Sequence, residues 1–216
     1  MSESSFIRVA NDASSRNDLV ERGFTRRPLR IDVDIARSLE ELAHAAWSIP
    51  RDKYYEGGDR YRSLNRVRAE IVEGGVKVWA SEESTPYVQL KKYNTTIGGL
   101  PREYAPLPLT IAASMGVRKM IAHHLHYLPL SAEGTKYLVN VHVIRFVATP
   151  GRPCDTSPPG LHKDGKSILR RICWAAAALA AVKSSSPTTT NTNWSASRCA
   201  KPASVTSLTM IASGIC

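Results

Sequence analysis

The chain has 216 residues, of which 43% are hydrophobic and 22% charged, so it is long enough to bury the core of one domain. No run of about 20 apolar residues occurs, and residues 1–12 are polar. The four cysteines are widely spaced, which is typical of free thiols in a reducing compartment. These features predict a cytoplasmic protein without a signal peptide or a membrane span.

The net charge of +10 is unevenly distributed. Of the 29 Lys and Arg residues, six lie in residues 166–216, which contain no Asp or Glu. A basic nucleic-acid-binding protein is one interpretation of such a charge. However, no basic stripe interleaved with aromatic residues is visible, so we expect no nucleic-acid partner.

A first helix is expected over residues 34–48. Asp34 can serve as its N-cap, and Pro50 follows its end. One face of this helix is apolar, which predicts that it packs on the rest of the fold. The residues of this face are Ile35, Leu39, Leu42, Ala43, Ala46 and Trp47.

A second, largely buried helix is expected from Leu107 to about Leu125. Its end carries His123, His124 and His126. Histidines at a helix end more often cap carbonyl groups than bind metal, and we favour capping here.

Strands are expected around and after this second helix. Residues 69–72 and 76–80 flank Glu73-Gly74-Gly75, which predicts a hairpin because glycine adopts the positive φ of a tight turn. A further strand is expected over residues 87–97. The segment 136–148 is apolar on both alternating faces, so it should be a central strand. Helices followed by a sheet indicate an α+β fold with a β-sandwich or barrel core.

The composition changes after Gly165. Residues 166–216 contain no Asp, Glu, His, Tyr or Phe. The apolar run 168–182 predicts a helix, and the Ser/Thr-rich run 184–192 predicts a disordered segment. The sequence therefore divides into a folded part, residues 1–165, and a tail, residues 166–216.

His162 and Asp164 form a His-x-Asp pair. In an extended segment these side chains point the same way, so that an imidazole and a carboxylate can bind one metal ion. With one further histidine they would form the facial triad of non-haem Fe(II) oxygenases. The pair alone is a weak signal, and a non-catalytic β-sandwich binding module with an incidental His-x-Asp is the alternative.

The surroundings of this pair resemble a known family. The strand Val141-His142-Val143-Ile144-Arg145-Phe146 leads through a proline-containing loop to Leu161-His162-Lys163-Asp164-Gly165. This arrangement is similar to that of the bacterial 2-oxoglutarate/Fe(II)-dependent dioxygenases that include the L-isoleucine hydroxylases. Arg60-Tyr61-Arg62-Ser63 also resembles an arginine-rich element of that family.

The resemblance implies a double-stranded β-helix of the jelly-roll or cupin kind with N-terminal helices, incomplete at its C-terminal end. It implies that His162 and Asp164 bind Fe(II), that 2-oxoglutarate is the co-substrate, and that a free amino acid or similar small molecule is hydroxylated. The family also needs a distal histidine and a basic residue that binds 2-oxoglutarate, yet no histidine follows His162. We therefore expect a truncated site with doubtful activity.

A slip of the reading frame near the codons for 164–166 would explain the unusual tail. In the alternative frame the codon that straddles Met210 and Ile211 must encode aspartate, and the one that straddles Trp174 and Ala175 must encode glycine. That frame can also restore aromatic residues and a distal histidine. On this hypothesis, the tail is unrelated to the dioxygenase fold and adds no strands to its sheet.

Overall fold

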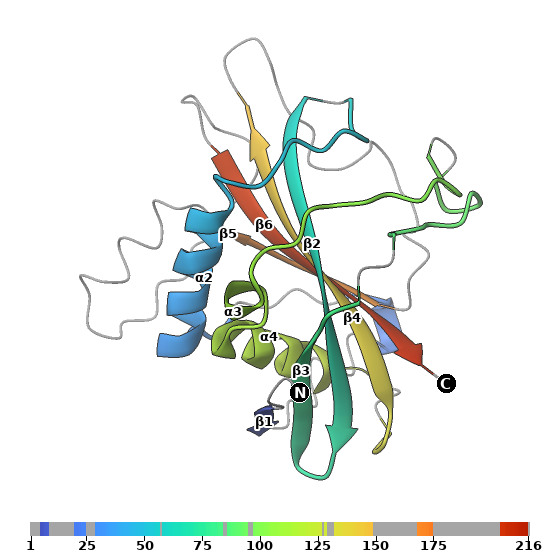
Figure 1. Cartoon of the computed structure of the whole chain (residues 1–216). Helices are drawn as coiled ribbons and strands as arrows, with labels where there is room; N and C mark the ends of the chain where they lie inside the picture. Colours follow the sequence, from blue (N-terminus) through green and yellow to red (C-terminus); the bar gives the residue numbers. More distant parts are fainter. Residues whose placement is uncertain are drawn as a thin grey trace.

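The computed structural model describes ten segments of the chain. For the last two of them it gives the backbone and, of the side chains, only Ile172. In these segments an antiparallel sheet carries helices on one face (Figure 1), and no described helix is long and apolar enough to cross a membrane. The described residues are 5–8, 20–24, 29–56, 58–83, 86–94, 97–126, 128, 132–148, 168–174 and 204–215.

The sheet has six strands in the order β1-β3-β2-β4-β6-β5, and each neighbouring pair is antiparallel (Figure 1). Strand β4 lies between β2 and β6 and pairs with both along its whole length. This confirms that the segment predicted from residue 136 is a central strand. The strands are β1 Ser5–Arg8, β2 Asp59–Val72, β3 Gly75–Ser81, β4 Lys136–Val147, β5 Ile168–Trp174 and β6 Ser204–Ile215.

Strands β2 and β3 form the expected hairpin, in which Gly74 has φ +72°. However, β2 begins at Asp59 rather than at Ala69. Its first half contains arginines at alternate positions, so the sequence showed no apolar strand pattern there. Residues between the arginines are nevertheless buried.

Helix α2 spans Val33–Ala45, and its N-cap is Asp32. The expectation that Asp34 caps this helix was wrong, because the Asp32 carboxylate accepts a hydrogen bond of 2.9 Å from the backbone N–H of Ile35. Asp34 lies in the first helical turn instead. The helix ends before the expected Ser48, and residues 46–48 continue as a turn.

The single helix expected from Leu107 is divided into α3, Leu109–Ala112, and α4, Met115–His126. At the break the Ser38 hydroxyl of α2 contacts Ser114 and accepts from the backbone N–H of Gly116. A β-carbon on Gly116 would lie 2.3 Å from the Asp34 carbonyl oxygen. The sequence pattern showed continuous apolar periodicity but not this close crossing of two helices.

The strand expected over residues 87–97 is absent from the described part of that segment. Tyr87 makes an isolated bridge with Arg102, and the rest forms turns. Asn94 accepts a hydrogen bond from Ile97 through its side chain, and Gly99 has φ +84°. Local side-chain bonding of asparagine and the freedom of glycine outweigh the strand propensity here.

The main hydrophobic core lies between the helices and one face of the sheet. Val139, Val141 and Val143 of β4 belong to this core, together with Leu39 and Leu42 of α2. Alternate β4 residues face the other side of the sheet and are also buried, as His142 and Ile144 show. Burial on both faces explains the apolar character of this strand.

The helix expected from residue 168 was wrong where the structure describes it, and the Ser/Thr-rich run 184–192 lies outside the described residues. Ile168 begins strand β5 rather than a helix, and β5 pairs with β6. Strand β6 pairs with β4 from Lys136↔Ile215 to Val147↔Ser204. Two strands of the tail thus join the sheet, which weighs against a tail unrelated to the fold.

The fold class is α+β, as expected. The described strands form one sheet, and a second sheet that would complete a jelly roll is not among them. The double-stranded β-helix therefore stays a prediction.

Candidate functional site

A cluster of polar and aromatic side chains lies on the face of the sheet opposite the helices. Arg60 and Arg62 of β2 and His142 of β4 contribute to it, because they alternate with residues that face the helical side. Tyr87 and Tyr104, from the segment between β3 and α3, complete it. We call Asp52, Arg60, Arg62, Tyr87, Gln89, Arg102, Tyr104 and His142 the arginine cluster.

His142 is fully buried at the centre of the cluster, and Arg62 contacts its ring. The Nε and Nη2 atoms of Arg62 lie 3.3 and 3.2 Å from Nδ1 of His142. Arginine has only donors, so Nδ1 can accept these hydrogen bonds only when it carries no proton. The Nη2 atom of Arg62 also lies 3.5 Å from Nε2 of His142. The contact with Nδ1 fits the tautomer whose ring proton is on Nε2.

Two tyrosine rings surround this pair. Tyr87 lies edge-on to His142, with ring centroids 5.1 Å apart. The Cζ atom of Arg62 lies 4.5 Å from the Tyr104 ring centroid, and that of Arg102 lies 4.8 Å from the Tyr87 ring centroid. Such cation–π contacts hold guanidinium groups in place without neutralising them.

Arg60 differs from the other arginines of the cluster because it has a carboxylate partner. Asp52, of which 3% is exposed, accepts from Nε and Nη2 of Arg60 at 3.0 and 2.7 Å and from the backbone N–H of Tyr54. Burial lowers the pKa of Arg60, and the charge of Asp52 opposes this effect.

Arg62 and Arg102 form no ion pair with any residue that the structure describes. Arg102 is 2% exposed and donates to the Gln89 side chain at 2.6 Å, while its Nε has no hydrogen-bond partner within the described segments. The cluster thus contains three guanidinium groups and one carboxylate. This excess of positive charge makes it suitable for an anion.

Tyr104 lies within the field of all these charges. Burial raises the pKa of its hydroxyl, and Asp52 acts in the same direction, while Arg62, Arg102 and Arg60 oppose the increase. Its hydroxyl oxygen is buried and has no hydrogen-bond partner in the described part of the chain. Tyr104 therefore offers a neutral donor beside the guanidinium groups.

The expected metal ligands His162 and Asp164 lie outside the described residues. Within the segments that the structure describes, no group of three or more His, Cys, Asp or Glu residues could hold a metal ion. The histidines of α4 belong to the helical layer, on the other side of the sheet from His142. The described residues therefore do not form an iron site by themselves.

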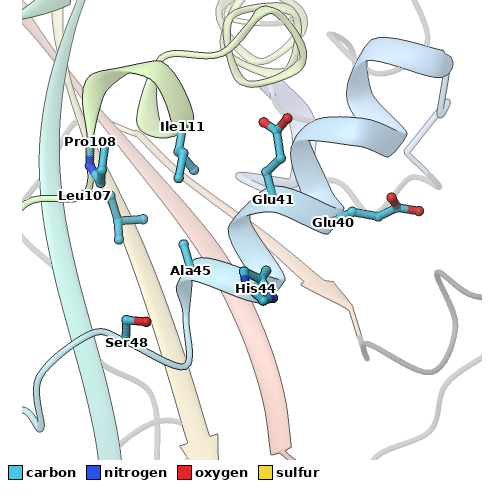
Figure 2. A pocket seen from close by; sticks show the side chains of 8 residues that line it. All are labelled: Glu40, Glu41, His44, Ala45, Ser48, Leu107, Pro108 and Ile111. Atoms are coloured by element: carbon cyan, nitrogen blue, oxygen red, sulfur yellow. The ribbon is translucent and has the colours of Figure 1, made fainter.

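A groove of about 550 Å³ lies on the helical side of the fold, between α2 and the segment from Leu107 to Ile111 (Figure 2). Its surface is mainly apolar, with Glu40, Glu41 and His44 among the residues that line it. The arginine cluster lies on the opposite face of the sheet, so the groove is not part of that cluster.

Comparison with known proteins gives the family. The family described as 2OG-Fe dioxygenase matches residues 43–184, about two thirds of the chain. The chain belongs to this family, whose members use Fe(II) and 2-oxoglutarate. The match includes β5 and extends beyond Gly165, where we expected the resemblance to end.

A curated relative is the 3(1)-hydroxy-L-isoleucine 4-dioxygenase of Pantoea ananatis (strain AJ13355). The two sequences are 25% identical over 139 residues, which are 63% of this chain and 54% of the relative. The chain thus spans about half the length of the curated relative that it matches.

Two solved structures have a similar fold. The bsmA homolog from Methylobium petroleophilum PM1 superposes with a TM-score of 0.54 at 15% identity, over 82% of this chain and 81% of that one. IDO from Bacillus thuringiensis superposes with a TM-score of 0.51 at 14% identity, over 94% and 92% of the two chains.

The sequence indicated only part of the arginine cluster. Arg60 and Arg62 were recognised within an arginine-rich element, and His142 only as a buried strand residue. Asp52, Arg102 and Tyr104 were not singled out, because they lie in segments without periodicity. Arg62 and His142 lie on the same face of two paired strands. This relation could not be used, because the first strand was expected only from residue 69.

Proposed function

We propose that this chain is a 2-oxoglutarate/Fe(II)-dependent oxygenase that hydroxylates a free amino acid or a similar small molecule. The family match over residues 43–184 carries this proposal. The name of the Pantoea ananatis relative supports an amino acid as the class of substrate.

In this proposal His162 and Asp164 provide two protein ligands for Fe(II). The bound iron and 2-oxoglutarate together supply the oxidising chemistry that the protein's own side chains lack. No histidine follows His162 in the sequence. The Nδ1 atom of His142 is occupied by Arg62. We therefore expect the chain to bind Fe(II) weakly, because two protein ligands hold the ion less firmly than three.

Iron binding and turnover test the proposal separately. Titration of the full chain with Fe(II) under anaerobic conditions should show one weak site that is lost in His162→Ala and Asp164→Ala and retained in the control His44→Ala. Equal binding by all four proteins would contradict the assignment of the ligands.

Turnover is measured as succinate formation with Fe(II), ascorbate, 2-oxoglutarate and a panel of aliphatic L-amino acids. We expect little succinate from the chain as given, and amino-acid-dependent succinate from a chain restored to the alternative frame after Asp164. Failure of both chains with every amino acid would contradict the proposed class of substrate.

A further inference from the structure

We propose that Arg62, with Tyr104 beside it, binds the carboxylate group of a small organic acid on the face of the sheet opposite α2 and α4. The inference rests on the proposed function for the choice of acids, 2-oxoglutarate and an aliphatic L-amino acid. Both contain the group that a guanidinium recognises best, a carboxylate that accepts two parallel hydrogen bonds.

The first argument is electrostatic. Arg62 is half-buried and its Cζ lies 4.5 Å from the Tyr104 ring centroid and 5.5 Å from that of Tyr87. Removing a cation from water is costly unless an anion compensates it. Asp52, the carboxylate of the cluster, already pairs with Arg60. A bound acid would therefore neutralise charge that the described residues leave uncompensated.

The second argument concerns hydrogen bonds. Arg62 uses Nε and Nη2 toward His142, and no described residue accepts from its Nη1. The buried Tyr104 hydroxyl also has no partner among the described residues. These two donors belong to neighbouring side chains, since Arg62 stacks on the Tyr104 ring. A carboxylate has enough lone pairs to accept from both.

The third argument is rigidity. Arg62 is held by a buried histidine and two aromatic rings, and Asn65 of the same strand anchors the segment that follows Tyr104 through two hydrogen bonds with Leu107. Little side-chain entropy is then lost when a ligand binds. A prepositioned guanidinium of this kind favours binding more than one on a mobile surface side chain.

The test is calorimetric titration of the metal-free full chain, from which chelator has been removed, in a buffer without carboxylate or phosphate. The probes are 2-oxoglutarate and L-isoleucine, each paired with a neutralised analogue, the dimethyl ester and L-isoleucinamide. At least one acid should bind, and its analogue should bind tenfold more weakly or not at all. The acid that binds identifies the source of the carboxylate.

The variants locate the site. Arg62→Gln should weaken binding of that acid about tenfold or more, Arg62→Lys should weaken it less, and Tyr104→Phe about threefold. Arg68→Gln is the matched control, because Arg68 lies on the same strand and face but pairs with Glu83; its affinity should stay within twofold. If Arg62→Gln does not fold, as judged by circular dichroism, Arg62→Lys and Tyr104→Phe decide the question.

Three results would overturn the inference: no binding of either acid to the wild-type chain, equal binding of acid and neutral analogue, or equal loss in Arg68→Gln and Arg62→Gln. These results are independent of the proposed oxidation, because no metal is present. Arg62-dependent binding, together with no succinate from the chain restored to the alternative frame, would support the carboxylate site and contradict the proposed function instead.

Discussion

The side-chain amide of Asn65 and the backbone of Leu107 exchange two hydrogen bonds, each 2.9 Å long. Both residues are buried, and Leu107 begins the approach to helix α3. One side chain of β2 thus satisfies a backbone donor and a backbone acceptor that would otherwise be buried without partners.

Replacing Asn65 should therefore cost more than loss of a surface amide. We expect Asn65→Ala to lower the free energy of unfolding by about 2–3 kcal/mol, because it leaves two buried backbone groups unsatisfied. Asn140→Ala is a matched control, since both residues are 5% exposed and the Asn140 side-chain oxygen has no hydrogen-bond partner in the described segments. Urea denaturation measures both, and equal costs would contradict the assigned role of Asn65.

The ion pair between Asp52 and Arg60 gives a second prediction. Their side chains are 0% and 13% exposed, so Asp52→Asn would leave a buried guanidinium without its counterion. We expect a loss of about 3 kcal/mol in the free energy of unfolding. Asp59→Asn is the control, because Asp59 pairs with Arg51 at the surface, and its loss should be below about 0.5 kcal/mol.

The cap of helix α2 gives a prediction that depends on pH. Burial tends to raise the pKa of Asp32, but the hydrogen bonds from Lys119 and the Ile35 backbone lower it overall. A lowered pKa in the folded state means that this carboxylate contributes stability above its unfolded pKa of about 3.9 and loses the contribution as the pH falls through the folded value.

Two variants separate the cap from the charge. Asp32→Asn keeps the side-chain oxygen that caps Ile35 and should cost only a few tenths of a kcal/mol, whereas Asp32→Ala should cost about 1 kcal/mol. The difference between wild type and Asp32→Asn should shrink below about pH 4. Thermal melts between pH 3 and 7 measure it, and a difference that grows toward acid pH would refute the role of the charge.

Replacement of glycine by alanine should lower the free energy of unfolding by different amounts at two positions. Gly116→Ala would place a β-carbon 2.3 Å from the Asp34 carbonyl oxygen and 2.5 Å from the Ser38 hydroxyl, so α2 and α4 would have to separate. We expect a loss of about 3 kcal/mol in the free energy of unfolding. Gly74→Ala meets nothing within 4 Å but keeps φ +72°, which should cost about 1 kcal/mol. A smaller cost for Gly116→Ala would contradict the close crossing of these helices.

Strand β6 can be tested by proline substitution. Leu208 lies opposite Val143 of β4 and Ile172 of β5, so Leu208→Pro removes a ladder hydrogen bond and should cost about 3 kcal/mol or more. Ser204→Pro, at the first residue of the strand, should be tolerated. Unchanged stability of Leu208→Pro would show that the tail is not part of the sheet and would favour the reading-frame hypothesis. The nucleotide sequence after the Asp164 codon tests that hypothesis directly.

The sequence correctly predicted elements that depend on residues close together in the chain, and a strand that is buried on both faces. The β2–β3 hairpin followed from its glycines, and β4 from apolar residues on both faces. The position of helix α2 followed from its apolar stripe, although its N-cap is Asp32 rather than Asp34. These features depend on neighbours in the sequence or on simple alternation.

The sequence could not predict features that depend on distant partners. The break between α3 and α4 requires Ser38 from another helix. Strand β6 pairs with β4, and β5 pairs with β6. The small and polar residues of β6 gave no strand pattern, and the apolar run that begins with β5 was interpreted as a helix. Arg102 and Tyr104 join the arginine cluster only because Tyr104 packs edge-on against His142 and Arg102 packs on the Tyr87 ring.

The pairing of β4 with β2 and β6 also sets the order in which the chain can fold. Leu64 pairs with His142, and Val143 pairs with Leu208, so the two longest ladders join residues more than fifty positions apart. The β2–β3 hairpin can form early, whereas the edge of β4 that pairs with β6 stays unpaired until β6 has left the ribosome. Such high contact order predicts slow folding and a lasting exposed edge on β4 during synthesis, when chaperones that bind unpaired strands would be needed most.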